Sequence, residues 1–196
     1  EMCIRDRCVF HHTGGEQSMI TFQVDQASLQ HVQKKLGTMQ SKAPIVISRA
    51  LNKTAVSARQ RLANRAQQAY TVKSGGFKKD MQIKKASSGN LVAEIRSQGR
   101  PLKITKFKYS APQSGAKADI TKSGLKALVM GNIKAFKRNG QIFQRRSAAR
   151  LPIKVLSSNS IPKMIGSEKR VYGIVKPNIE SDLRKYMEAQ IKMLVG

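Results

Sequence analysis

The residues best suited to metal binding or redox chemistry gather at the start of the sequence. They are Cys3, Cys8, His11 and His12. Thiols and imidazoles are common zinc ligands, and two cysteines can form a disulfide, so this cluster could in principle do either. After this cluster the chain has no further cysteine and one further histidine, His31. Any metal or thiol chemistry would therefore depend on the first twelve residues.

Those first residues do not read like the beginning of a folded domain. Residues 1–18 show no amphipathic period, and the string from Met2 to Arg7 looks like translated sequencing adapter. From Met19 onward the sequence alternates like a strand and leads directly into a helix signal. We therefore predict that residues 1–18 are a non-native leader and that Met19 is the true start. On this interpretation the cysteines and histidines form no metal site.

The rest of the chain offers no recognisable catalytic set. Its acidic residues are scattered singly, so the sequence shows no pair of catalytic carboxylates and no histidine–carboxylate pair at a useful spacing. Ser74-Gly75-Gly76 is interpreted as a flexible turn and not as a phosphate-binding loop. His31 is interpreted as a surface or partly packed helix residue. We expect a protein that is not an enzyme and that uses no cofactor.

The net charge is the most unusual property of the sequence. Its 37 lysines and arginines outnumber 11 acidic residues, which gives a formal charge of +26 in 196 residues. Such an excess repels itself unless a polyanion or an acidic partner surface lies nearby. No apolar run reaches the roughly 18 residues of a membrane-spanning helix, so we expect a soluble protein with no membrane partner. The length predicts one core and a single domain, residues 19–196.

Two helices are predicted near the N-terminus. Asp25 is a suitable N-cap for the first helix, and Gly37 is a natural end. A longer helix begins after Ser41 and runs toward Tyr70, because apolar residues recur at helical spacing. This apolar stripe consists of Ile47, Leu51, Ala55, Ala58, Leu62, Ala66 and Ala69. The opposite face carries Arg49, Lys53 and Arg61. That basic face is either simply solvated or a partner-binding surface.

After these helices the apolar period changes to two, which is typical of strands. Strand patterns at 81–83, 91–95 and 102–104, separated by turn residues, predict a three-stranded antiparallel meander. A segment rich in Ser, Ala, Gly and Lys, about residues 109–127, predicts a long exposed and mobile loop. Asn139-Gly140 is a strong signal for a hairpin turn, and both of its arms are basic.

The last part of the chain adds one strand and two helical segments. The strand is expected at Leu151–Leu156 and a short helical turn at Ile161–Ile165. The final helix is expected to begin at an Asn178 cap, with its apolar residues on one face. Helices, then antiparallel strands, then a helix indicate an α+β fold. In it the N-terminal helices and the C-terminal helix pack on an antiparallel sheet that carries basic hairpins.

One stretch of this sequence resembles a known family. The basic segment Arg145–Leu156, which runs into Arg-Leu-Pro-Ile and is followed by Ser160–Ile165, is similar to the late motif of the phage minor tail protein Z family. These are tail-completion proteins of long-tailed bacteriophages. Members often have a Tyr-Gly-Pro-Ser type turn where this chain has Ser157-Ser158-Asn159-Ser160. The upstream segments that occur in the family's order are Ala50–Ala55, Leu91–Ile95 and Arg100–Phe107.

The resemblance implies a structural protein of the virion with no catalytic residue. It implies a late tail component near the head-proximal end, made in the host cytoplasm and assembled with other tail or neck proteins. A homo-oligomeric ring is the expected assembled state. The motif residues expected to have structural roles are Leu151, Pro152, Ile153, Pro162 and Met164. The candidate contacts for assembly, or for DNA in the tail lumen, are Lys134, Lys137, Arg138, Arg145, Arg146 and Arg150.

The positive charge leaves alternatives open. Within a tail it could meet acidic surfaces of other tail proteins, or it could contact DNA through phosphates without reading sequence. A different class of function is a free basic nucleic-acid-binding protein, which a pI of about 10.7 favours. Against that class, the sequence has no Trp, only 5% aromatic residues for stacking on bases, and no recognised nucleic-acid-binding module.

Overall fold

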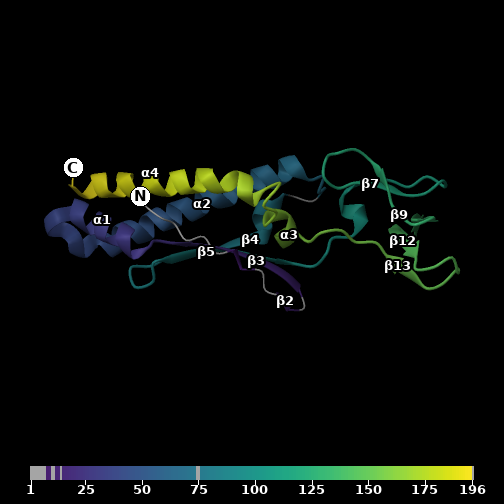
Figure 1. Cartoon of the computed structure of the whole chain (residues 1–196), viewed down its shortest axis with the longest axis horizontal. Helices are drawn as coiled ribbons and strands as arrows, with labels where there is room; N and C mark the ends of the chain where they lie inside the picture. Colours follow the sequence, from purple (N-terminus) through teal and green to yellow (C-terminus); the bar gives the residue numbers. More distant parts are fainter. Residues whose placement is uncertain (1–7, 10–11, 14, 74–75, 196) are drawn as a thin grey trace.

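The fold is α+β, as the sequence predicts, and the molecule is elongated (Figure 1). The computed structural model describes residues 8–9, 12–13, 15–73 and 76–195. Long helices and the largest sheet occupy one end of the molecule, and several small sheets occupy the other. We call residues 15–102 and 158–195 the body, and residues 103–157 the basic lobe.

Helix α1, Gln26–Leu36, forms where the sequence predicts it. The Asp25 carboxylate caps it by accepting a hydrogen bond of 2.8 Å from the backbone N–H of Ser28. The helix ends at Gly37, whose φ of 54° lies in the region that favours glycine. Both ends of α1 are therefore set by local chemistry that is visible in the sequence.

Helix α2, Ala43–Ala69, is the central helix of the body. A 3-10 turn, Gly37–Lys42, leads into it, and Pro44 is accommodated in its first turn. The predicted apolar stripe is correct, since it is fully buried except at Ala69, which is half-buried. Alanines dominate the buried face, and their small side chains let neighbouring elements approach closely.

Helix α4, Tyr172–Val195, lies along α2 (Figure 1). The prediction that this helix begins at Asn178 is wrong, because the helix starts at Tyr172 and continues through Pro177. Val175 and Ile179 are both buried and lie one turn apart on the same face. Packing of that face therefore extends the helix upstream, although the proline removes one backbone donor.

The largest sheet has the strand order β1-β3-β5-β4, and β2 also pairs with β3. Its strands, all antiparallel to their neighbours, are β1 (Cys8–Val9), β2 (His12–Thr13), β3 (Gly15–Gln23), β4 (Met81–Lys84) and β5 (Val92–Gly99). Ile95 of β5 pairs with Ile20 of β3 on one side and with Ile83 of β4 on the other. Buried positions alternate along β5, so one face of the sheet is covered.

The three-stranded meander needs correction. Its first two strands are confirmed as β4 and β5, but residues 102–104 do not form the third. The third partner of this sheet is β3, which pairs with β5 over eight residues from Glu16 to Gln23. Pro101 has no backbone N–H to donate to a sheet, and Ile104 begins a 3-10 turn that ends at Lys106.

Strand β3 begins before Met19, the predicted start of the domain. Glu16–Ser18 pair with Ser97–Gly99, because β5 extends far enough to offer them hydrogen-bonding partners. Much of the predicted leader, including Cys3 and His11, lies outside the described residues. Cys8 and His12 lie in the two short strands β1 and β2.

The short helix α3, Ile161–Ile165, confirms the helical turn predicted there. Ser160 caps it by accepting a hydrogen bond of 3.3 Å from the backbone N–H of Lys163. Pro162 and Met164 are buried, and the helix contacts both β3 and β5. It therefore closes the core of the body between α2 and the sheet.

The basic lobe contains three small antiparallel sheets. Their strands are β6 (Lys108–Ser110), β7 (Lys117–Asp119) and β8 (Lys126–Ala127); β9 (Val129–Met130) and β10 (Ile133–Lys134); and β11 (Phe136–Arg138), β12 (Gln141–Arg145) and β13 (Ile153–Val155). The predicted hairpin at Asn139-Gly140 is confirmed between β11 and β12. Its two turn residues have φ values of 47° and 72°, as a type I′ turn requires.

The long exposed and mobile loop expected at about residues 109–127 also needs correction. This segment includes the paired strands β6, β7 and β8, and Ala116, Ala118 and Asp119 are buried. Its backbone is paired as well: Ala116 donates to the Ala135 carbonyl, and Leu128 donates to the Ala116 carbonyl. The core of the lobe is thin, and small side chains fill it. A segment rich in Ser, Ala, Gly and Lys, a composition typical of loops, therefore forms paired strands here.

A narrow connection joins the basic lobe to the body. The chain enters at Leu102–Ile104 and returns at Leu156–Asn159, and the two segments exchange backbone hydrogen bonds. The residues after α2 add a second link, because Thr71 and Lys73 donate backbone hydrogen bonds to the carbonyls of Ile120 and Lys106. Phe107 is fully buried in the core of the body, which anchors the lobe at its base.

Candidate assembly surface

Positive charge is concentrated on the basic lobe. Its 55 residues contain thirteen lysines and arginines and one acidic residue, Asp119. The Asp119 side chain is buried and accepts a hydrogen bond of 3.1 Å from the backbone N–H of Ser123. Twelve of the thirteen cations are exposed, and Lys154 is half-buried. The lobe therefore presents a surface of a single sign of charge.

Lys134 and Arg145, two of the predicted contact residues, line the same pocket of about 500 Å³. They come from β10 and β12, which the Gln144 side chain links by donating a hydrogen bond of 3.1 Å to the Ile133 carbonyl. Gly115 and Ser147 also line the pocket, so little side-chain bulk separates the two cations from solvent. Two cations at one cavity can bind an anionic group such as a carboxylate or a phosphate.

Lys137 and Arg138 lie on the first arm of the hairpin. The Lys137 ammonium lies 5.9 Å from the ring centroid of Tyr109, and the Lys73 ammonium lies 4.7 Å from the same centroid. Lys73 belongs to the segment after α2, so this aromatic ring makes cation–π contacts with one cation of the body and one cation of the lobe. Sequence reasoning missed Tyr109 and Lys73, because no local pattern links them to the hairpin.

Arg146 and Arg150 lie in the bend between β12 and β13, and both are exposed. The Arg146 backbone N–H donates a hydrogen bond of 3.1 Å to the Pro152 carbonyl, which closes the bend. The bond between Leu151 and Pro152 is a cis peptide. The structure thus places these two arginines on the outer surface of the lobe, beside the arm that carries Arg145.

The motif residues divide between the two parts of the molecule. Leu151 and Pro152 are exposed on the lobe and Ile153 is half-buried in β13, whereas Pro162 and Met164 are buried in α3 of the body. The motif is therefore not one site. It runs from the surface of the lobe, through the connection at residues 156–159, into the core of the body.

Apolar side chains are exposed among the cations of the lobe. Five large ones are Leu125, Val129, Met130, Leu151 and Val155, with Leu151 66% exposed. Exposed apolar clusters rimmed by polar residues are typical of protein interfaces. Two of the five, Val129 and Met130, follow Leu128 in a short apolar run, which is a local signal for this surface in the sequence. This mixture of apolar and basic side chains is better suited to a protein partner than to phosphates alone.

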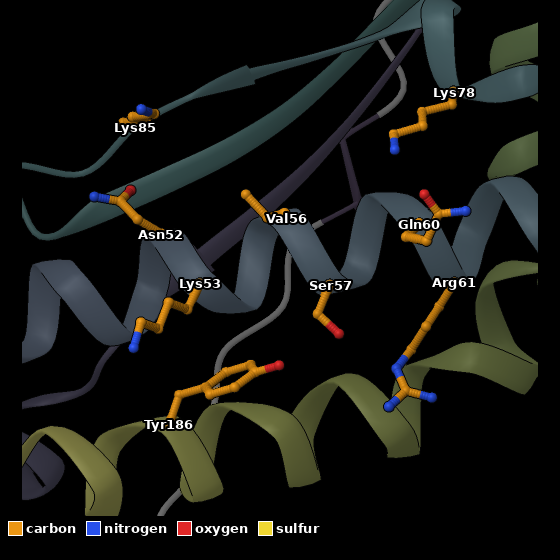
Figure 2. Close-up of a pocket in the computed structure, with 9 residues that line it drawn as sticks. All are labelled: Asn52, Lys53, Val56, Ser57, Gln60, Arg61, Lys78, Lys85 and Tyr186. Atoms are coloured by element: carbon orange, nitrogen blue, oxygen red, sulfur yellow. The ribbon is translucent and has the colours of Figure 1, made fainter.

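A second basic surface lies on the body. A groove of about 820 Å³ runs beside α2, and nine residues line it (Figure 2). Its lining includes Lys53, Val56, Arg61, Lys78, Lys85 and Tyr186. We call this cavity the α2 groove. It contains two of the three residues of the basic helix face that the sequence indicates, but not Arg49.

Arg61 is an exposed member of that face, but its charge is paired. Its guanidinium forms a two-pronged ion pair with Asp182 of α4, with N···O distances of 2.8 and 3.1 Å. The Ser57 hydroxyl donates to the same carboxylate at 2.6 Å. Burial raises the pKa of Asp182, but the hydrogen bonds from Arg61 and Ser57 outweigh burial and the pKa is lowered. The hydrogen bond to Asp182 raises the pKa of Arg61. This cluster fastens α2 to α4.

Metal-ligating side chains are scattered over the part of the chain that the structure describes. Within those residues there is no group of three His, Cys, Asp or Glu side chains that could hold a metal ion. His31 is exposed on α1. Over the same residues, no helix has both the length and the apolar character needed to cross a membrane.

The features that mark this molecule are therefore two surfaces, the basic lobe and the α2 groove. Each combines cations with exposed apolar side chains, and the α2 groove is built by elements far apart in the sequence. The chain matches no protein-family model, no curated protein and no solved structure with which it was compared.

Proposed function

We propose that this protein is a structural minor tail protein of a bacteriophage or prophage, which acts in completing the tail near its head-proximal end. The observation that carries the proposal is the basic lobe, which combines thirteen cations with a set of exposed apolar side chains on short strands and their connections. Such a surface supports docking to neighbouring proteins. The resemblance of Arg145–Leu156 to the tail-completion motif is the reason for proposing that these neighbours are proteins of the virion.

In this proposal the body is a scaffold and the lobe is the contact. Ring subunits join head to tail through two different surfaces, and an elongated chain with a distinct lobe at one end provides two such surfaces. Edge strands such as β13 can also pair with a strand of a neighbour. The cations meet acidic surfaces of other tail or neck proteins, and those that face the lumen contact DNA in passage.

A second candidate is a free basic nucleic-acid-binding protein, which the single sign of charge on the lobe favours. The two candidates differ in the partner that saturates the lobe. Fluorescence anisotropy of a labelled DNA duplex with the isolated chain distinguishes them. Tight and saturable binding by the monomer at physiological salt supports the second candidate, whereas weak binding that disappears at modest salt supports the first.

The tail proposal is tested by deleting the coding region from an inducible phage and examining the lysate. The expected result is DNA-filled heads together with tails that fail to yield infectious particles, seen by electron microscopy and by plating. Infectivity is expected to return when the intact coding region is supplied from a plasmid. Normal, infectious particles from the deletion phage would contradict the proposal and leave the nucleic-acid-binding candidate.

A further inference from the structure

The α2 groove lies on the body, away from the basic lobe, and the proposed function makes no use of it. Figure 2 shows α2 between α4 on one side and the strand side of the body on the other. Lys53 and Tyr186 lie on the α4 side, whereas Val56 lies on the side of Lys78 and Lys85. The groove therefore has a helix as its floor and walls from two separate elements.

The walls are held in place before any partner arrives. On one side, the Asn52 side chain donates to the Ala86 carbonyl at 3.0 Å and accepts from the Ala86 backbone N–H at 2.8 Å. On the other side, Asp182 binds Ser57 and Arg61, as described above. Both walls are thus bonded to α2 itself. A preformed groove loses less conformational entropy when it binds a partner.

The charge of the groove has one sign. Its cations are Lys53, Arg61, Lys78 and Lys85, and none of the nine lining residues is acidic. Only Arg61 among them has an ion pair in the described part of the chain. Three ammonium groups therefore line the groove without an ion-paired carboxylate among the described residues.

The floor of the groove is apolar at its centre. Val56 is 51% exposed, although it lies in the middle of a long helix whose other valine, Val46, is fully buried. Tyr186 adds a half-buried aromatic ring to the α4 wall. A ligand that complements this surface carries negative charge at its edges and an apolar side chain at its centre.

We propose that the α2 groove binds an acidic, amphipathic segment of a partner protein, with an apolar side chain seated on Val56 and carboxylates facing Lys53, Lys78 and Lys85. The positive charge of the groove favours an acidic partner. The exposed valine favours a peptide, because a peptide can place an apolar side chain on it. Single-stranded nucleic acid is disfavoured, because it binds mainly through stacking on several aromatic rings and the groove offers only Tyr186. This binding site is independent of the basic lobe and of tail assembly.

The test begins with selection of random peptides of about 14 residues, displayed on phage, against the full chain. The enriched peptides are then synthesised with a fluorescent label, and their affinities are measured by anisotropy. Enriched peptides are expected to be acidic, with apolar residues at helical or alternating spacing. Enrichment without an acidic bias would overturn the proposal.

Charge variants locate the binding. Replacing Lys53, Lys78 and Lys85 together with Gln is expected to weaken peptide binding by about tenfold or more. The matched control replaces Lys34, Lys35 and Lys192 with Gln, which removes the same charge from other exposed parts of the body. It is expected to change the affinity by less than about twofold. Equal weakening by the two triple variants would overturn the proposal.

The apolar floor is tested separately. Val56→Asp is expected to abolish binding of the selected peptides, whereas Ile174→Asp, at a residue that is 45% exposed on α4, is expected to leave it unchanged. Circular dichroism and Tm confirm that each variant is folded.

Peptide binding that survives Val56→Asp but is lost when Lys137, Arg138, Arg145 and Arg146 are replaced by Ser would move the site to the basic lobe. If a DNA oligonucleotide binds in a way that depends on the groove residues, and no selected peptide does, the groove is a nucleic-acid site. Each of these two results would overturn the proposal.

Discussion

The body and the basic lobe are built in opposite ways. Among the described residues, the core of the body contains 31 buried hydrophobic residues from helices, sheet and connections. The second core, inside the lobe, contains five, and three of them are alanines: Ala116, Ala118 and Ala135. Since apolar burial is the main stabilising contribution in folding, the body is the stable part and the lobe depends on backbone pairing and on its base.

The charges divide in the opposite direction. The lobe is little more than a quarter of the chain, yet it contains thirteen of the 37 basic residues and only one of the eleven acidic ones. The small apolar core of the lobe contributes little stability, and its basic side chains repel one another. The lobe would therefore have low stability as an isolated domain. The body therefore supplies most of the folding free energy, while the lobe supplies a surface that an acidic or apolar partner would cover.

The largest expected effect comes from breaking the core of the body. Leu51 lies fully buried in the middle of α2, so Leu51→Ala is expected to cost about 4 kcal/mol of unfolding free energy through lost burial and a residual cavity. Urea denaturation followed by circular dichroism measures it. Ile45→Ala, at a residue that is 40% exposed on the same helix, serves as the control and is expected to cost less than about 1 kcal/mol. Similar costs for the two changes would contradict the assigned core.

The same change in the lobe is expected to stay local. Ile142 of β12 is buried in the core of the lobe, and Ile142→Ala is expected to cost about 3 kcal/mol. The buried residues of the two cores form distinct clusters, although the half-buried Ile120 packs against both. Amide hydrogen exchange should therefore speed up in β7, β10 and β12 while α2 keeps its protection. Loss of protection in α2 as well would show that lobe and body unfold as one unit.

The link between α2 and α4 should depend on pH. The pKa of Asp182 is lowered in the folded chain, so its ionised form stabilises the fold above the unfolded value of 3.8, and this stabilisation is lost as pH falls below that value. Asp182→Asn is expected to cost about 2 kcal/mol near neutral pH. The difference from the original chain should shrink as unfolding is measured from pH 5 toward about pH 3. A difference that is constant over this range would contradict the ion pair.

The smallest expected effect concerns the hairpin turn of the lobe. Gly140 has a φ of 72°, so Gly140→Ala introduces backbone strain and is expected to cost about 1 kcal/mol. Gly89→Ala is the control, since Gly89 has no such φ and its added methyl would meet no atom within 4 Å. Thermal unfolding compares the two. Equal values of Tm for both variants would argue against the type I′ turn.

Local chemistry made much of the body predictable. The Asp25 cap, the end at Gly37 and the apolar stripe of α2 are short-range signals, and each is confirmed. The pairing of β3 with β5 was not predictable, since the two strands are separated by α1 and α2. The early start of α4 was missed for the same reason, because the face that carries Val175 is stabilised by packing against distant residues.

The basic lobe shows the other limit of sequence reasoning. Its strands are two to five residues long, too short for alternation to show, and only the Asn139-Gly140 turn has an unmistakable local signature. The exposed cations were predictable from composition, since charged side chains seldom lie in cores. The α2 groove was not, because its floor and its α4 wall are joined by pairs such as Ser57 and Asp182, which are 125 positions apart.

The most direct test of the account asks whether the charge of the lobe serves assembly. The deletion phage is supplied with a variant in which Lys137, Arg138, Arg145 and Arg146 are replaced by Ser, and infectious titre is measured beside a variant that replaces Lys34, Lys35, Lys79 and Lys192 by Ser. All eight are exposed, and the two variants remove equal charge. We expect a folded lobe variant that fails to restore the titre and a body variant that restores it. Full restoration of the titre by the lobe variant would show that the charge of the lobe is not needed for tail assembly.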